Sequence, residues 1–459
     1  MTVFSNENQK KAASLDQHIY EFCPADNAIF PRCMIHYYYR NAEDIPEFME
    51  FSTLKDTFYQ ALSACLPMTL GFQVHMESPP FGKLTVTADA ANPRMPPVTK
   101  HIDNNHTIAE MTACGFAIQS QPAVLAKAPL LANPLEGDPL VTLDVVYMTD
   151  GVGLLLAFSH AIADLSGFQR FVCEWSCLNR SKVSKTPCIG YTPVQLDTDR
   201  MLFWNNILKY PQPDSSDIEQ HLDKLSSTDN LSQLSVPPAV ASDFSVYRIE
   251  VSVAAIKEIA VLKSQMCPKV TVPSLIAAAL WKSISLANTC SPYTYFANSL
   301  SIRNIPEFAD FCGNTATMKY AYQKTATLVS QSVFDISQQI QRSSSSFTVG
   351  EFARIIDGYT DSENTYSKNL ARFVENNRAP RLMVTNVSRI AFYNADFGYG
   401  TPVKLFFPAE IPPGFCAFMP LSKEGGIDIL LCTTDNAIKN IKSDQLLKNR
   451  IVVYRHDVV

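Results

Sequence analysis

The chain has 459 residues, of which 46% are hydrophobic and 18% are charged. This length predicts two or three domains, or one large protein of two lobes, and the composition excludes intrinsic disorder as the general state of the chain. The formal net charge of −6 is not the positive net charge typical of proteins that bind nucleic acid or an anionic membrane surface. With 16 glycines, the chain is a poor candidate for a protein built on glycine-rich phosphate loops.

The sequence also predicts a cytoplasmic protein without a bound metal. No apolar stretch follows the N-terminal lysines, as a secretory signal would require. A run of about 18 uninterrupted apolar residues, the length of a membrane span, does not occur. The cysteines include no C-x-x-C pair, so the spacing typical of zinc ligands is missing.

In the first half of the chain, the clearest pattern is a hairpin followed by a helix. A helix is predicted earlier, at residues 51–66, from apolar residues at helical spacing. Strands are predicted at 140–148 and 152–159, joined by Asp150-Gly151, a dipeptide typical of two-residue hairpin turns. The second of these strands is almost wholly apolar, which predicts a buried central strand.

The second half repeats the mixture of strands and helices after a long polar stretch. Residues 179–243 are rich in Ser, Asp, Pro and Gln, which is typical of a connection between two lobes. Beyond it we expect strands at 244–251, 293–302, 382–390, 403–408, 416–419 and 427–432. We also expect a helix at 254–263, a second helix opened by Thr271 and Pro273, and a final helix that ends near residue 447. This order predicts an α/β protein of two lobes with mixed sheets.

A histidine follows the predicted central strand directly. The sequence there reads H-x-x-x-D-x-x-G, with His160, Asp164 and Gly167, and Asp164 is placed to cap the next helix. Because burial disfavours a charged imidazole, a neutral His160 could accept a proton from an alcohol or amine. Asp164 could orient the histidine as a dyad, or it could pair with an arginine as a structural brace. The spacing does not decide between these two roles.

These residues and a second motif resemble the BAHD-type, CoA-dependent acyltransferases. The family's D-F-G-W-G segment is present at residues 396–400, with Tyr399 in place of tryptophan. The segments SIRNIP around Arg303 and FCGN at 311–314 agree with the family in order. Within the family, the chain is most similar to the fungal trichothecene O-acetyltransferase branch, in which the glycine after the site aspartate is displaced by two positions, as at Gly167.

The resemblance implies a fold and a reaction. The fold is chloramphenicol-acetyltransferase-like, with two similar α/β lobes, flanking helices and a solvent channel between the lobes. Residues 1–178 would form the lobe with the histidine, 179–243 the crossover loop and 244–459 the lobe with DFGYG. The reaction moves an acyl group, acetyl by default, from acyl-CoA to a small-molecule alcohol or amine. Acyl-CoA is then a co-substrate, no cofactor is permanently bound, and the protein is a monomer of secondary metabolism.

The resemblance also assigns roles to individual residues. His160 is the general base, and Asp164 forms a salt bridge with Arg303 instead of relaying protons. In the DFGYG segment, Asp396, Gly398 and Gly400 are expected to shape a turn with positive φ near the CoA side of the channel. Thr385, on a predicted strand, is the candidate hydrogen-bond donor to the oxyanion, and a threonine with a purely structural place in the strand is the alternative.

Two other functions remain open from the sequence. A condensation-type domain would take acyl groups from a carrier protein, but such domains have two adjacent histidines followed by D-G, where this chain has Ser159 and Leu165. A non-catalytic family member that binds a metabolite is the other alternative. It is motivated by the segment from Thr385 to Val387, in which the family often has a tryptophan.

Overall fold

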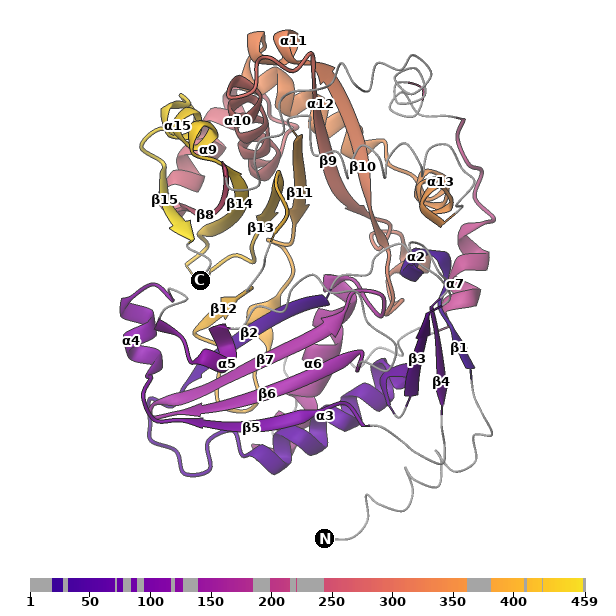
Figure 1. Cartoon of the computed structure of the whole chain (residues 1–459), viewed down its shortest axis with the longest axis vertical. Helices are drawn as coiled ribbons and strands as arrows, with labels where there is room; N and C mark the ends of the chain where they lie inside the picture. The colour runs from indigo at the N-terminus through magenta and orange to yellow at the C-terminus, as the bar shows by residue number, and fades with distance from the viewer. Residues whose placement is uncertain are drawn as a thin grey trace. The chain divides into compact units, whose positions relative to one another are not determined.

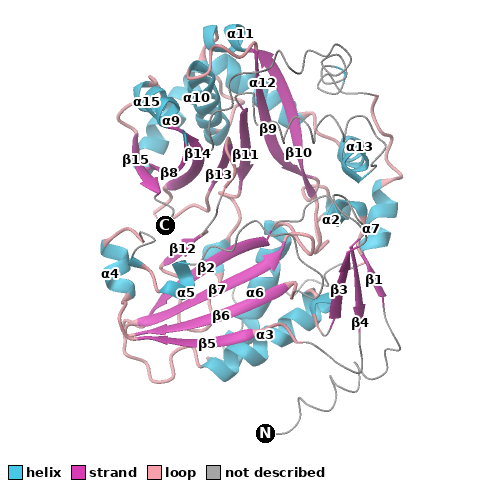
Figure 2. Ribbon diagram, viewed as in Figure 1, coloured by secondary structure: helices cyan, strands magenta, loops and turns pink. Residues whose placement is uncertain are grey.

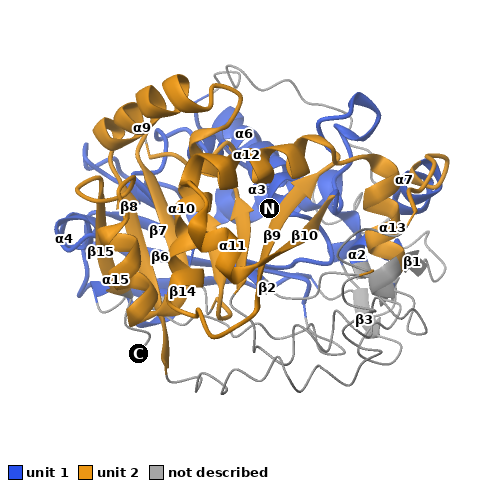
Figure 3. Cartoon of the chain, turned by 90° about the horizontal axis from the view of Figure 1, so that it is seen from above, with its two compact units in different colours: residues 1–206, 303–315, 391–409 blue, residues 207–302, 316–390, 410–459 orange. Residues whose placement is uncertain are grey.

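The computed structural model describes residues 19–27, 32–70, 72–76, 84–88, 95–116, 120–126, 139–184, 199–214, 220, 243–360, 381–407, 411–422 and 424–456. Most of the predicted crossover, at 185–198, 215–219 and 221–242, lies outside these residues. Contacts divide the chain into two compact units (Figure 3). Unit 1 comprises residues 1–206, 303–315 and 391–409, and unit 2 comprises residues 207–302, 316–390 and 410–459.

Unit 1 contains a five-stranded sheet in the order β12-β2-β7-β6-β5 (Figure 2). Its strands are β2 (Arg32–Arg40), β5 (Val98–Asp103), β6 (Val141–Met148), β7 (Gly151–Ser159) and β12 (Lys404–Phe406). The β5–β6 pair is parallel, and the other pairs are antiparallel. The predicted hairpin is therefore present as β6 and β7, and every residue of β7 is buried, as expected of a central strand.

Unit 1 contains two long helices, α3 and α6, and several shorter ones. They are α2 (Pro24–Asn27), α3 (Phe51–Cys65), α4 (Ile108–Ala113), α5 (Ala123–Ala126) and α6 (Leu165–Val183), and α7 (Arg200–Ile207) begins in this unit. A separate three-stranded sheet has the order β1 (Ile19–Glu21), β4 (Leu84–Ala88), β3 (Phe72–Met76). The helix α3 packs on α6, and α6 packs on β7, where Phe168 stacks on Phe158 with ring centroids 3.5 Å apart. This packing fixes the start of α6 beside the end of β7.

Unit 2 contains a seven-stranded mixed sheet in the order β10-β9-β11-β13-β14-β8-β15 (Figure 1). The strands are β8 (Phe244–Val251), β9 (Tyr293–Ser301), β10 (Ala316–Lys324), β11 (Arg381–Asn386), β13 (Phe415–Phe418), β14 (Ile427–Thr434) and β15 (Ile451–His456). The helices are α9 (Val253–Met266), α10 (Val272–Leu286), α11 (Thr325–Ser330), α12 (Val333–Ser345), α13 (Val349–Thr360) and α15 (Asp435–Ser443). The core of this unit is formed around α10, from which ten residues are buried.

The fold class predicted from the sequence, two α/β lobes with mixed sheets and flanking helices, is confirmed. The channel between lobes and the boundaries at residues 178 and 243 stay predictions. Contacts assign the DFGYG segment to unit 1, although it follows most of unit 2 in the chain. The physical reason is β12, which follows DFGYG and pairs antiparallel with β2 of unit 1, Leu405 opposite Tyr37. No described helix combines the length and the hydropathy needed to span a membrane.

Candidate active site

His160 occupies the turn between the central strand of unit 1 and a helix. β7 ends at Ser159, whose carbonyl oxygen accepts a hydrogen bond from the amide of Ile162, so the chain turns immediately after the strand. The helix α6 then begins at Leu165. The ring of His160 is only partly exposed. Its burial lowers the pKa of His160 below the ordinary value, against the opposing effect of the Asp164 carboxylate. A neutral imidazole is therefore favoured at neutral pH.

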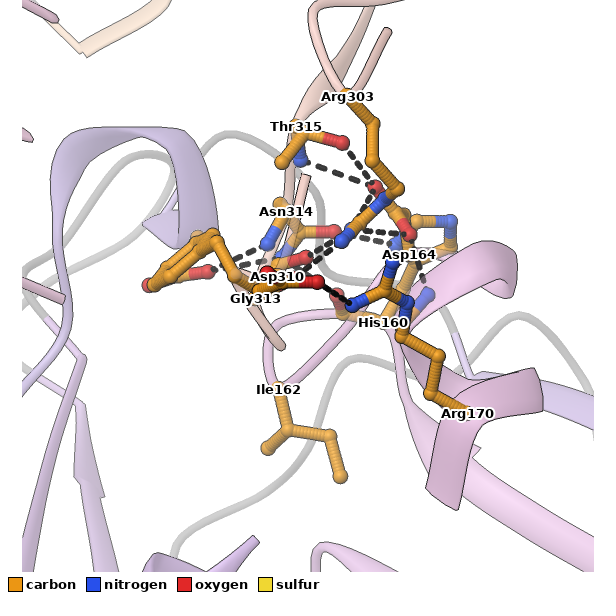
Figure 4. A network of polar contacts seen from close by, with 12 residues as sticks. His160, Ile162, Asp164, Arg170, Arg303, Asp310, Gly313, Asn314 and Thr315 are labelled. Atoms are coloured by element: carbon orange, nitrogen blue, oxygen red, sulfur yellow. Dashed lines mark hydrogen bonds and ion pairs between the residues drawn. The ribbon is translucent and has the colours of Figure 1, made fainter. Parts of the chain in front are cut away.

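Asp164 caps α6 and is fully occupied by other partners. Its Oδ1 accepts from the amide of Gly167 at 2.8 Å, as an N-cap side chain does. Its Oδ2 accepts from the amide of Thr315 at 3.0 Å and from the Thr315 hydroxyl at 2.8 Å. Nη2 of Arg303 lies 3.0 Å from both oxygens (Figure 4). Among the described residues, no hydrogen bond joins Asp164 and His160.

The ion pair between Asp164 and Arg303, expected from the resemblance, is present. Burial opposes ionisation of Asp164, but Arg303 and the donors from Gly167 and Thr315 outweigh it and lower the pKa of Asp164. Arg303 also donates to the carbonyl oxygens of Phe311 and Gly313. The guanidinium thus ties the start of α6 to the loop at 303–315. This ion pair is the arrangement expected of a structural brace, the second of the two roles left open by the spacing, and that role stays a prediction.

Gly167 has a packing role that the motif alone did not reveal. A Cβ atom at this position would lie 2.5 Å from the carbonyl oxygen of Cys312, much closer than a van der Waals contact. The first turn of α6 therefore approaches the backbone of the FCGN segment closely, and glycine makes the approach possible. The glycine of H-x-x-x-D-x-x-G and the FCGN segment are two sides of one contact within unit 1.

Asn314, the last residue of FCGN, is the partner of the histidine ring. Its Oδ1 lies 3.1 Å from Nδ1 of His160, and its side chain is fully buried. In the sequence, FCGN was only a sign of family resemblance, and Asn314 had no predicted role. No local pattern could have found it, because 154 residues separate Asn314 from His160. The position of FCGN after Arg303 was the available signal, since a brace from Arg303 to Asp164 brings that loop to the histidine.

The DFGYG segment forms a turn fastened to α6. Oδ1 of Asp396 accepts from the amides of Gly398 at 2.8 Å and Gly400 at 3.0 Å, and Oδ2 pairs with Arg180 at 2.8 Å. The two glycines have φ of +101° and +92°, the positive values that the sequence predicted. Phe397, between them and Asp396, is buried against Trp175 of α6, with ring centroids 4.5 Å apart. The turn is thus an architectural part of unit 1, and its proximity to CoA stays a prediction.

Thr385, the candidate oxyanion donor, belongs to the other unit. It lies on β11, paired with Ala417 of β13, and its side chain is partly exposed. Its role stays a prediction. Among the described residues, no cluster of three or more His, Cys, Asp or Glu side chains is arranged to hold a metal ion.

Solved structures of other proteins share the fold of this chain. The structure of this chain is similar to that of F. graminearum TRI101 in a complex with coenzyme A and T-2 mycotoxin, with a TM-score of 0.68 and 16% identity over 95% of this chain and 99% of that chain. It is also similar to vinorine synthase, with a TM-score of 0.62 and 13% identity over 97% of this chain and 98% of that one. At such identities, these matches establish the two-lobed fold.

The family follows from the sequence match. The model of the Transferase family matches residues 110–447, which include both motifs and the segment from Arg303 to Asn314. A hydroxycinnamoyltransferase from Narcissus pseudonarcissus is 24% identical over 422 residues, or 90% of each chain. The chain belongs to the Transferase family, the BAHD-type acyltransferases that its motifs resemble, and is therefore of the acyltransferase class.

Proposed function

We propose that this protein transfers an acyl group from acyl-CoA to a hydroxyl group of a small secondary metabolite, with His160 as the general base. The observation that supports the proposal most directly is that Asp164 and His160 bind different partners. Asp164 is occupied by Arg303, Thr315 and the amide of Gly167, whereas the ring of His160 is bound only through Nδ1. In the described chain, Nε2 of His160 has no hydrogen-bond partner, so this nitrogen is left for a substrate.

The reaction needs little beyond a base and two positioned substrates. Nε2 of His160 takes the proton of the acceptor hydroxyl as its oxygen attacks the thioester carbonyl, and a tetrahedral intermediate forms. The C–S bond then breaks, and the imidazolium returns the proton to the CoA sulfur. We assign Thr385 as the donor to the oxyanion, an interaction for which one donor typically contributes about 2.7–4 kcal/mol. Because a thioester is already activated, acyl-CoA is used as a co-substrate and no resident cofactor is required.

The choice of substrates rests on similarity to known proteins. The TRI101 structure contains coenzyme A together with a mycotoxin, and this supports acyl-CoA as donor and a small hydroxylated molecule as acceptor. Acetyl is the default acyl group, and an amine acceptor is the close variant of the same chemistry. That the protein is a cytoplasmic monomer of fungal secondary metabolism stays a prediction.

A panel of substrates tests the proposal. Purified protein is incubated with free acetyl-CoA or longer acyl-CoAs and a set of terpenoid, polyketide and alkaloid alcohols and amines, and the products are identified by mass spectrometry. We expect acylated product and equimolar free CoA without any carrier protein. Product formed only from an acyl group loaded on a carrier protein would instead indicate condensation-type transfer. Tight metabolite binding without acyl-CoA binding, both measured by calorimetry, would indicate a non-catalytic protein.

A further inference from the structure

The loop that ends in Asn314 connects the proposed base to a buried ion pair. Asp26, in α2, is fully buried and lies 2.7 Å from Nη1 of Arg200, the first residue of α7, whose side chain is 5% exposed. Oδ1 of Asp26 accepts from the backbone amide of Asn314 at 3.3 Å and from its side-chain Nδ2 at 3.0 Å. All of these residues belong to unit 1. A continuous polar chain therefore runs from Arg200 through Asp26 and Asn314 to His160.

The partners of Asn314 define which way its amide points. Besides Asp26, Nδ2 lies 2.9 Å from the carbonyl oxygen of His160 and 3.2 Å from that of Ala161. Three acceptors surround this atom, so it must be the NH₂ group, and a flipped amide would place an oxygen against a carboxylate and two carbonyls. The amide oxygen is thereby directed to Nδ1 of His160.

This orientation dictates the tautomer of the histidine. An amide oxygen can only accept, so Nδ1 must carry the proton when the ring is neutral. In a neutral ring with its proton on Nδ1, Nε2 has the free lone pair that a general base requires.

We propose that Asn314 is a positioning residue that keeps His160 in the Nδ1–H tautomer, and that the Arg200–Asp26 pair locks the orientation of its amide. This inference deepens the proposed function and rests on it for its catalytic consequence. The tautomer itself is a property of the free protein. When His160 becomes cationic during the reaction, the same amide oxygen accepts from the imidazolium, so the interaction serves both states of the ring.

Two variants separate positioning from structure. N314L removes the acceptor at similar volume, and we expect kcat to fall about 10- to 100-fold, the range for a hydrogen bond to a charged group, with little change in the KM for acyl-CoA. The same loss should move the acid limb of kcat/KM to lower pH, because the hydrogen bond to Asn314 raises the pKa of His160.

A matched control comes from a buried amide elsewhere in the same unit. Asn179 of α6 is 1% exposed and donates through Nδ2 to the carbonyl oxygen of Phe397 at 2.8 Å, without contact to His160. N179L should lower the melting temperature, as N314L does, but should leave the acid limb of kcat/KM in place. A purely structural Asn314 would make the two variants behave alike.

Nitrogen NMR of the histidine rings reads the tautomer without any turnover. Protein labelled with ¹⁵N-histidine is compared with the H160Q variant to assign the ring of residue 160. We expect Nδ1–H in the wild type and a mixture of tautomers in N314L. A wild-type ring protonated on Nε2, or an N314L ring with both the wild-type tautomer and the wild-type pH profile, would overturn the proposal. An Nδ1–H ring in a protein that transfers no acyl group would uphold this inference and reject the proposed function.

Discussion

The brace between Asp164 and Arg303 can be tested by removing one charge. In D164N, a neutral amide replaces a carboxylate that is 5% exposed and accepts from Arg303, Thr315 and Gly167. The new NH₂ group would face donors on one side, and Arg303, whose side chain is 11% exposed, would lose its counter-ion. Breaking a buried pair from one side costs about 3–5 kcal/mol, and we expect this loss in the free energy of unfolding at pH 7.

The pH dependence of the same variant provides an independent check. Because the pKa of Asp164 is lowered in the folded protein, its contribution to stability is fully present above the unfolded pKa of about 3.9. It is lost as the pH falls through the lower, folded value. The difference in stability between wild type and D164N should therefore be constant from pH 7 to about pH 5 and should shrink only below about pH 4.

Urea unfolding followed by circular dichroism measures this difference, and a nearby exposed pair supplies the control. Asp310 lies 3.2 Å from Arg170, and its side chain is 51% exposed. D310N should therefore cost less than about 1 kcal/mol. Equal effects of D164N and D310N at pH 7, or a D164N deficit that stays constant down to pH 3, would refute the brace.

Three further predictions concern the same unit. The value of kcat/KM should fall with decreasing pH with a midpoint below about 6.5, because burial lowers the pKa of His160 and a protonated ring cannot act as a base; a midpoint above 7 would contradict this. G167A should lower stability by about 1–3 kcal/mol in thermal unfolding, since its Cβ would lie 2.5 Å from the carbonyl oxygen of Cys312, and an unchanged melting temperature would refute that contact. D396A should lower the melting temperature, because it removes the acceptor for two backbone amides and the partner of Arg180. R180M leaves both amides bonded to Asp396 and should lower the melting temperature less; the reverse order would contradict the proposed turn.

The local elements of the site could be predicted from the sequence because their signals are short-range. The dipeptide Asp150-Gly151 marked the hairpin, the apolar run of β7 marked a central strand, and Asp164 marked the start of α6. Within the polar stretch at 179–243, α7 was missed, because four of its apolar residues form one continuous run at 201–204 without helical spacing. The last strand, β15, was also missed, because an edge strand with exposed Val452 and Tyr454 lacks a clear buried face.

The long-range parts of the site could not be derived from local patterns. Residues 303–315 and 391–409 belong to unit 1 because of contacts made far along the chain, such as β12 with β2 and Arg303 with Asp164. The resemblance to the family supplied the Arg303 pairing, which the spacing of Asp164 had left open. Asn314 was missed for the same reason, as neither composition nor periodicity distinguishes a buried amide that orients a histidine from one that only fills a loop.

The rate of CoA release by H160Q tests the central claim most directly. Wild type and H160Q are compared with free acyl-CoA and an acceptor identified from the substrate panel, after circular dichroism and thermal unfolding show that both are equally folded. We expect H160Q to release CoA about 10²- to 10⁴-fold more slowly, the usual contribution of a positioned general base. A folded H160Q that turns over at the wild-type rate would contradict the assignment of His160 as the base.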